Sequence, residues 1–365
     1  MKKRLFTFIM TAAPLLCLPL LGAWIAGFPI SRYFEFPPRT IYIETAPFSR
    51  IHFIAYALIF LGMLAPMLIK GTLFYKSSKK RALLYSFPWW GWFAAILNMI
   101  SWVLAWSRFS WFESAQPHTF CFLWFPFIIV ANALCYARDG RSMLTHQTVF
   151  FLALFPASAV FWWFFEYLNR FVQNWLYAGS DLGPWTYFGY ATLSFSTVLP
   201  AVLTVRDWIC GTQWIQSGFG NWVRIRSFSS SRQAWFFLIL FSAGLAGIGV
   251  WPNFLFPLLW ASPLFMITSV QALMKERHLF SGIQRGDWRE IVSAAIAALI
   301  CGWFWEMWNY YSLTRWEYRI PYVHRFQIFE MPVLGYAGYL PFGLECAIIG
   351  NLMQQSMARF RRGSS

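Results

Sequence analysis

The sequence predicts an all-α, polytopic helical membrane protein with about ten transmembrane helices, arranged as hairpins with an internal parallel repeat. Of its 365 residues, 58% are hydrophobic and only 12% are charged, whereas a soluble domain carries about a quarter charged residues. The apolar runs are continuous and about 20 residues long, as a bilayer-spanning helix requires. A transmembrane barrel would instead show short segments of alternating hydrophobicity.

Ten apolar segments are expected to cross the membrane, and they pair as five hairpins. The first follows Met-Lys-Lys-Arg without a small-residue cleavage site, which indicates an uncleaved helix. Each returning helix is expected to contain a Pro that permits a kink, namely Pro66, Pro126, Pro200, Pro257 with Pro263, and Pro341. The ten segments are residues 5–27, 51–69, 88–106, 120–137, 148–168, 185–205, 234–250, 253–273, 290–311 and 331–354.

The hairpins divide the chain into five predicted parts. The longest inside loop contains a Gly-Phe-Gly and a Ser-rich run, and it is the candidate hinge or contact for a membrane protein partner. In order, the parts are the N-terminal hairpins at 1–147, the first repeat hairpin at 148–205, the cytoplasmic loop at 206–233, two further helices with their loop at 234–289, and the second repeat hairpin with a basic tail at 290–365.

The net charge of +15 is explained by its distribution. With ten spans and the N-terminus inside, 21 of the 29 Lys and Arg residues fall on the cytoplasmic side, as the positive-inside rule predicts. We therefore expect a multi-pass inner-membrane protein with both termini cytoplasmic, whose basic loops meet lipid head groups and not nucleic acid. The six scattered Cys and five isolated His predict no disulfide, metal or haem site, and no nucleotide or cofactor motif is present.

Two stretches carry the same unusual polar pattern within apolar segments. The first has Glu166 and Asn169, then Trp175-Leu-Tyr177, then Leu199-Pro200; the second has Glu306 and Asn309, then Trp316-Glu-Tyr318, then Leu340-Pro341. In each copy, 25 residues separate the Trp from the Pro. A Glu and an Asn three residues apart share one helix face, and such residues in a membrane are costly and usually functional. The alternative is that they form interhelical hydrogen bonds.

Glu345 is the most deeply placed carboxylate in the predicted topology. It lies 14 residues into the last segment, or about 20 Å below the outer interface. We expect it to be protonated at neutral pH and to act as a general acid in a cavity, with Glu306 or Asn309 within hydrogen-bond reach.

Aromatic residues are abundant and cluster beside the carboxylates. The chain has 23 Trp, 16 Tyr and 40 Phe, and Trp163, Trp303, Trp305 and Trp308 flank the Glu/Asn pairs. Aromatic faces stabilise cations, so these residues are candidates for lining a pocket for carbocation chemistry or for a flat apolar ligand. The competing interpretation is anchoring at the membrane interface together with packing.

The outer loop at 312–330 is polar, aromatic and basic. Arg315, Arg319, His324 and Arg325 could receive a phosphate or a lipid head group. The same cations could equally pair with the carboxylates within this loop, Glu317 and Glu330.

The layout Trp305-Glu306, Trp316-Glu-Tyr318 and Phe329-Glu330-Met-Pro332 resembles the lycopene cyclase domain family. That family has a Trp-Asp pair, then Trp-x-Tyr/Phe, then Pro-x-Glu-Glu opening a helix. The resemblance covers residues 303–345, and weakly 163–204, and it implies a cofactor-independent membrane terpene cyclase with related halves. The family's Glu pair is replaced by Leu334 and Gly335, or by Gly343 and Leu344 with Glu345 one residue late.

The leading hypothesis is an integral membrane enzyme acting on an apolar isoprenoid or lipid, with proton-initiated terpene or carotenoid cyclisation as the reaction. Glu345 would be the acid, Glu306 and Glu166 would orient groups or relay protons, and Asn169, Asn309, Trp316 and Tyr318 would complete the substrate site. The alternatives are a transporter or lipid flippase with repeats around a polar site, and a non-catalytic membrane subunit or assembly factor.

Overall fold

The structure, a computed structural model, describes residues 2–77, 84–179 and 182–363, and it confirms the predicted helical class. The chain is mostly helical, at 71% of residues, with 12 substantial helices. Four short strands, which were not predicted, form two antiparallel two-stranded sheets. The basic residues Lys79, Lys80 and Arg81, which were predicted to be cytoplasmic, lie outside the described residues.

The helices follow the predicted apolar segments, with short helices and strands between them. The strands are β1 (Trp175–Ala178), β2 (Arg315–Tyr318), β3 (Gln327–Ile328) and β4 (Met331–Pro332). The helices are α1 (Lys2–Ile25), α2 (Arg50–Ser77), α3 (Trp89–Trp106), α4 (Thr119–Asp139), α5 (Met143–His146), α6 (Thr148–Asn169), α7 (Pro184–Phe195), α8 (Val198–Cys210), α9 (Gln213–Phe219), α10 (Ser231–Gly247), α11 (Pro252–Leu255), α12 (Leu258–Leu273), α13 (Arg289–Tyr310) and α14 (Tyr339–Gly363).

Six helical segments of the described chain are long and apolar enough to cross a membrane, which indicates a multi-pass membrane protein. Two shorter apolar helices cover Thr11–Ile25 and Leu258–Leu273, so the count of ten crossings stays a prediction. The six segments are Arg50–Tyr75, Trp89–Trp106, Gln116–Asp139, Thr148–Asn169, Pro184–Cys210 and Arg289–Tyr310.

The predicted mid-helix Pro residues fall into two groups. Pro66, Pro126 and Pro263 lie inside helices. Pro200, Pro257 and Pro341 instead lie at the starts of α8, α12 and α14, so the prediction of an internal Pro was wrong for Pro257 and Pro341. Pro200 lies within the apolar segment Pro184–Cys210, which is interrupted between α7 and α8 just before it, as the predicted kink requires. The first turn tolerates Pro because its N–H would have no helical carbonyl to meet.

The last predicted segment begins later than expected, which changes the position of Glu345. Residues 331–338 form β4 and a short 3-10 helix at Gly335–Gly338, and α14 begins at Tyr339. Glu345 is thus six residues, or about 9 Å, from the start of its helix, and not 14 residues into it. The prediction failed because an apolar run containing a Pro and two Gly was taken as continuous helix.

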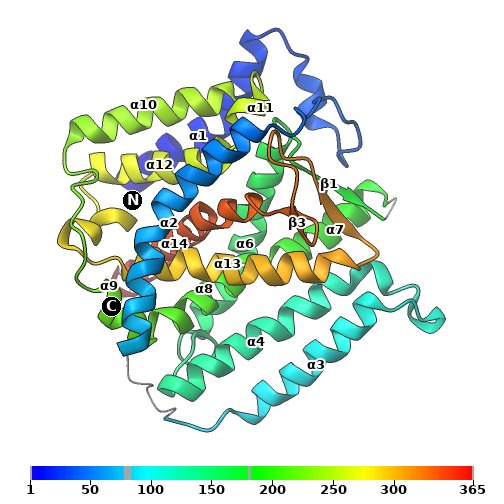
Figure 1. Ribbon diagram of the computed structural model, residues 1–365, viewed down its shortest axis with the longest axis vertical. Helices are drawn as coiled ribbons and strands as arrows, with labels where there is room; N and C mark the ends of the chain where they lie inside the picture. Colours follow the sequence, from blue (N-terminus) through cyan, green and yellow to red (C-terminus); the bar gives the residue numbers. More distant parts are fainter. Residues whose placement is uncertain (1, 78–83, 180–181, 364–365) are drawn as a thin grey trace.

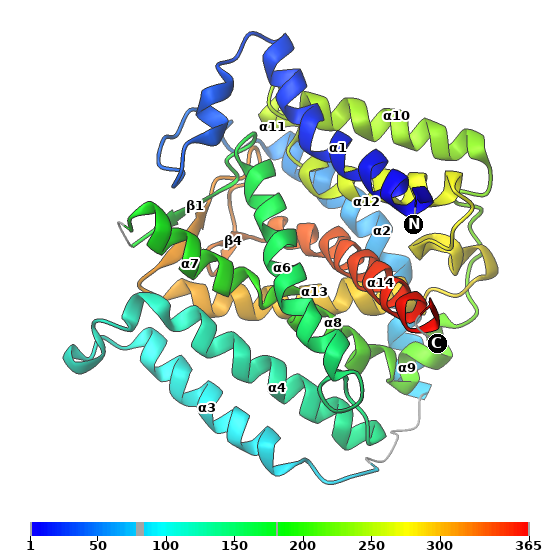
Figure 2. The same cartoon turned by 180° about the vertical axis from the view of Figure 1, so that it is seen from behind.

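The helices pack around α13. α3 lies beside α4 at one edge of the molecule, and α1, α10 and α12 lie side by side at the other (Figure 1). Between them, α13 contacts α8 and α14. The β1–β2 sheet lies on one side of the molecule, and both chain ends lie on the opposite side (Figures 1 and 2).

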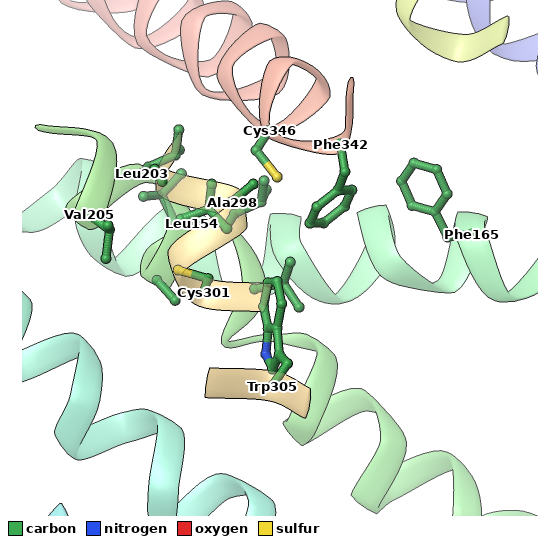
Figure 3. Packing of buried hydrophobic residues seen from close by; sticks show 14 of the residues in the cluster. Leu154, Phe165, Leu203, Val205, Ala298, Cys301, Trp305, Phe342 and Cys346 are labelled. Atoms are coloured by element: carbon green, nitrogen blue, oxygen red, sulfur yellow. The ribbon is translucent and has the colours of Figure 1, made fainter. Parts of the chain in front are cut away.

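The buried core lies where α6, α8, α13 and α14 meet. Figure 3 shows Leu154, Leu203, Ala298 and Cys346 gathered there, one from each of these helices. Close approach of α14 to α13 depends on Gly343, because a Cβ at this position would collide with the backbone of Ala294. This packing fixes the ends of α6 and α13, which carry the polar groups of the site.

Candidate functional site

Glu166, near the end of α6, accepts three hydrogen bonds from aromatic side chains. The donors to its Oε1 are Trp162 Nε1 at 3.0 Å, Trp175 Nε1 at 2.9 Å and the Tyr177 hydroxyl at 2.6 Å. Trp162 lies one helical turn before Glu166 on the same face, and Trp175 and Tyr177 project to one side of β1. These donors compensate for burying a carboxyl that is only 3% exposed.

Glu306, near the end of α13, has matching surroundings. Its Oε1 accepts from the Tyr318 hydroxyl at 2.7 Å and from the Tyr339 hydroxyl at 2.5 Å. Trp316 Nε1 donates in turn to the Tyr318 hydroxyl at 2.9 Å. Glu306 is fully buried, and its Oε2 has no hydrogen-bond partner in the part of the chain that the structure describes.

The two carboxyls differ in their donors, because Glu166 accepts from three aromatic side chains and Glu306 from two. The position four residues before Glu306, which corresponds to Trp162, is Gly302. A Cβ at Gly302 would lie 2.5 Å from a ring carbon of Tyr339. The missing side chain therefore leaves room for Tyr339 of α14, whose hydroxyl replaces the indole N–H of Trp162.

Asn169 and Asn309 hold the chain where each helix turns into a strand. Asn169 Oδ1 accepts from the Asn174 N–H at 2.8 Å and the Trp175 N–H at 3.4 Å, while its Nδ2 donates to the Trp175 carbonyl at 2.8 Å. Asn309 makes the same pair of bonds with the N–H and carbonyl of Trp316, at 2.9 and 2.8 Å. Both amides thus position the strand that follows.

Replacing Asn169 by Ala should destabilise the protein markedly. The change leaves buried backbone groups of Asn174 and Trp175 without a partner, at a cost of about 1–3 kcal/mol for each group. The measurement is the thermal unfolding temperature of the purified protein in detergent, with Asn221→Ala at an exposed position as the control. Equal unfolding temperatures for the two variants would contradict the bridging role.

The strands β1 and β2 form an antiparallel ribbon that joins the two halves of the site. Trp175 pairs with Tyr318, and Tyr177 pairs with Trp316. Because alternate residues of a strand face the same side, these four aromatic side chains share one face of the ribbon. Glu166 accepts from Trp175 and Tyr177 of β1, and Glu306 accepts from Tyr318 of β2.

A cavity of about 420 Å³ lies against this face of the ribbon, and we call it the ribbon pocket. The volume falls within the roughly 300–1,000 Å³ typical of ligand sites. Glu166 and Glu306 lie behind its wall, bonded to tyrosines that line it. The aromatic lining consists chiefly of Trp162, Trp175, Tyr177, Phe195, Trp260, Trp305, Trp316, Tyr318 and Tyr339.

The predicted aromatic residues divide into two groups. Trp305, Trp316 and Tyr318 line the ribbon pocket. The other three do not line it. Trp163 donates its indole N–H to Thr192 Oγ1 at 2.9 Å, and Trp303 is 45% exposed. Trp308 packs on Trp124, with the ring centroids 5.3 Å apart. These three side chains fit packing or interface contacts better than ligand contacts.

The outer-loop cations differ in their surroundings. Arg315 lines the ribbon pocket and forms an ion pair with Glu317 at 2.9 Å, and Arg325 lies over the Phe48 ring at 5.2 Å. Arg319 donates its backbone N–H to the Asn174 carbonyl, and its side chain is exposed. Burial raises the pKa of Glu330 in this loop, and the Arg315 guanidinium opposes that shift. Internal pairing is therefore observed for Arg315, through its ion pair with Glu317.

Glu345 is buried, at 2% exposed, but it does not line the ribbon pocket. Its carboxyl faces the backbone of Leu264 on α12. Among the described residues, neither of its oxygens has a hydrogen-bond partner. The expected direct hydrogen bond to Glu306 or Asn309 is therefore not formed, whereas the alternative contact through one water stays a prediction.

Several pocket residues were missed as site candidates from the sequence. Trp175 and Tyr177 had a usable signal, because Trp-x-Tyr also occurs in the second copy at Trp316 and Tyr318. Tyr339 also had a weak signal, since it immediately precedes the repeated Leu-Pro. Trp260 of α12 had none, and it reaches the site only through the fold, with its ring centroid 5.9 Å from that of Trp175.

Within the residues that the structure describes, no group of three or more His, Cys, Asp or Glu side chains could hold a metal ion. No family model, curated protein or solved structure matches the chain. Function must therefore be argued from the ribbon pocket and its carboxyls.

Proposed function

We propose that this chain is an integral membrane enzyme that binds an apolar isoprenoid or lipid in the ribbon pocket and starts its reaction with a proton. The observation that carries the proposal is that two buried carboxyls are hydrogen-bonded to phenols lining one aromatic cavity. Aromatic faces stabilise cations, so such walls suit a carbocation. A carboxyl bonded to a phenol suits general acid catalysis at the wall.

In this mechanism Glu306 supplies the proton through Tyr318 or Tyr339. Its Oε1 lies 2.7 and 2.5 Å from the two hydroxyl oxygens. When Glu306 is protonated at Oε1 it can donate to one of these hydroxyls, whose own O–H then turns toward the ligand. The tyrosine protonates one carbon of a C=C bond and regains a proton from Glu306, which leaves a carbocation on the adjacent carbon.

The reaction ends when the carbocation loses a proton and a new C=C bond forms. The proposed base is Tyr177 with Glu166, whose Oε1 accepts three hydrogen bonds as a carboxylate can. Proton exchange with water restores both carboxyls. No electron is transferred, so the step itself requires no cofactor.

We further propose that the two halves are a parallel repeat within a ten-span protein. Matching hydrogen bonds at Glu166 and Glu306, and matching first-turn positions of Pro200 and Pro341, support this relationship. The resemblance to the lycopene cyclase domain family rests on Glu306, Trp316 and Tyr318, which all belong to the second half of the site. It favours cyclisation as the proposed reaction.

Reporter fusions should read cytoplasmic after Gly282 and periplasmic after Tyr322. The reasons are the excess of basic residues on the predicted inner side and the position of both chain ends on one side of the molecule (Figures 1 and 2). Paired phosphatase and fluorescent-protein fusions would measure this directly. A cytoplasmic signal after Tyr322 would contradict the ten-span orientation. A fusion after Ser180, which lies outside the described residues, is also expected to read periplasmic.

Lipid and pigment profiling of a strain lacking the gene tests the proposed function. We expect one apolar isoprenoid or lipid to accumulate and a product of equal mass to disappear, because a proton-initiated rearrangement changes no atoms overall. Complementation with the wild-type gene should restore the product. An unchanged profile would argue for a non-catalytic subunit, and an altered distribution between membranes without chemical change would argue for a transporter or flippase.

A further inference from the structure

We infer that the ribbon pocket opens sideways into the bilayer beside the middle of α2, and that its ligand is a lipid dissolved in the membrane that enters through this opening. This inference rests on the proposed function and specifies from which phase the substrate arrives. Tyr56, Ile59 and Phe60 of α2 line the ribbon pocket. α2 lies on the outside of the molecule, in front of α13 and α14 in Figure 1 and behind them in Figure 2. It is therefore an outer wall of the pocket.

α2 is held at its two ends. Before its N-terminus, the Ser49 N–H donates to the Tyr322 carbonyl at 3.0 Å, and one turn into the helix Tyr56 packs against a small buried hydrophobic cluster. Near its C-terminus α2 packs on α9. There a Cβ at Gly218 would lie 3.2 Å from the Cβ of Phe74, so the two helices are in close contact.

The middle of α2 is not packed in this way. Tyr56 and Met67 pack against buried hydrophobic clusters, whereas none of the described residues 57–66 between them belongs to such packing, and none of these residues is buried. This stretch is about 15 Å long at 1.5 Å per residue. Pro66 at its end lacks the N–H of a regular helical hydrogen bond, which permits the helix to bend there.

Met63 lies at the opening. Residues three or four apart share one side of a helix, so Met63 faces the same side of α2 as Ile59 and Phe60, which line the pocket, and as Met67, which packs against the core. Met63 is nevertheless 66% exposed. A side chain that faces the protein and is still two-thirds exposed has open space in front of it. This space lies one helical turn from the lining residues, so it adjoins the ribbon pocket.

The opening leads to the bilayer and not to water. Residues 51–69 of α2 contain no Asp, Glu, Lys or Arg, and Arg50 and Lys70 flank them. A helix of this length spans about 28 Å, close to the roughly 30 Å thickness of the hydrocarbon core. Met63 lies well within this stretch, so acyl chains meet the opening. A ligand that enters there must already be dissolved in the membrane.

The opposite wall of the pocket, formed by α7, is closed by packing. The rings of His118 and Tyr190, which both line the pocket, stack with centroids 3.6 Å apart. Ser194 Oγ of α7 lies 3.5 Å from Cys121 Sγ of α4. These contacts join α7 to the start of α4. The wall formed by α2 is therefore the one that can admit a ligand.

The test measures how fast tritiated geranylgeraniol, an uncharged 20-carbon isoprenoid, exchanges between the bilayer and the purified protein in lipid nanodiscs. Met63→Trp fills the opening, so we expect uptake and release both to slow by at least about 10-fold while the equilibrium affinity stays unchanged. Met63→Ala widens the opening and should speed both rates by about threefold or more. The control is Leu61→Trp, because Leu61 is 58% exposed but lies on the other side of α2.

The outcomes separate this inference from the proposed function. Wild-type exchange rates in both Met63 variants overturn the lateral opening, while an apolar ligand site stands. A loss of affinity in Met63→Trp with an unchanged uptake rate also overturns it, because this result places Met63 in the binding site itself. Failure of the wild-type protein to bind the probe overturns both. If Met63→Trp does not accumulate, the exchange rates of Met63→Ala decide alone.

Discussion

Replacing Glu306 by Gln should reduce turnover of the ribbon-pocket ligand by about 100-fold or more, since a general acid contributes a factor of this size. The amide oxygen of Gln can still accept from Tyr318 and Tyr339, whose hydroxyls bond to Glu306 at 2.7 and 2.5 Å. The protein should therefore accumulate and bind ligand normally. Two quantities would be measured on the purified variant in nanodiscs, namely the rate of product formation and the affinity for the ligand.

Glu345→Gln is the informative comparison for this experiment. Glu345 was the acid predicted from the sequence, but its carboxyl lies outside the lining of the ribbon pocket. We expect Glu345→Gln to retain most of the turnover and Glu113→Gln, at an exposed position, to retain all of it. Loss of turnover in Glu345→Gln together with normal turnover in Glu306→Gln would reverse the assignment.

Replacing Glu166 by Ala should have the largest effect on stability. The change removes the shared acceptor of Trp162, Trp175 and Tyr177, and each buried donor left unpaired costs about 1–3 kcal/mol. The summed cost of about 3–9 kcal/mol for three donors is comparable with the free energy of unfolding of a typical domain, which is about 5–15 kcal/mol. We expect a large fall in the thermal unfolding temperature and in the amount of protein recovered from membranes.

Two further variants show whether hydrogen bonding is the cause. Glu166→Gln keeps an acceptor oxygen and should recover most of the lost stability, whereas Glu113→Ala removes an exposed carboxyl and should change little. If Glu166→Ala unfolds at the same temperature as Glu113→Ala, the three hydrogen bonds do not contribute as proposed.

The sequence allowed the class of protein and the polar centre of the site to be predicted. Continuous apolar runs indicate helices whatever their packing. The repeated Glu and Asn pairs were recognisable because polar residues are rare in such runs. The pattern did not reveal that Asn169 and Asn309 fix strands. It also did not reveal that Glu166 and Glu306 bond to aromatic side chains, because all of these partners except Trp162 lie beyond the ends of α6 and α13.

The errors have identifiable physical causes. Hydrophobicity alone does not distinguish a helix from the short strand and 3-10 turn before Tyr339, and the last helix was therefore predicted to begin at residue 331 instead of Tyr339. Tyr339 reaches Glu306 because Gly302 on another helix leaves space for its ring. That arrangement depends on the contact between α13 and α14, which no local pattern encodes. Trp260 enters the site in the same way, through packing of α12.

Isotope incorporation tests the central proposal most directly. The wild-type protein in nanodiscs would be incubated in D2O with the lipid that accumulates in the deletion strain, and the product analysed by mass spectrometry and NMR. If Glu306 starts the reaction through a tyrosine of the ribbon pocket, the product should carry one deuterium at a carbon that does not exchange with solvent. Glu306→Gln should form labelled product about 100-fold more slowly or worse. A product free of solvent-derived deuterium would contradict proton-initiated chemistry in this pocket.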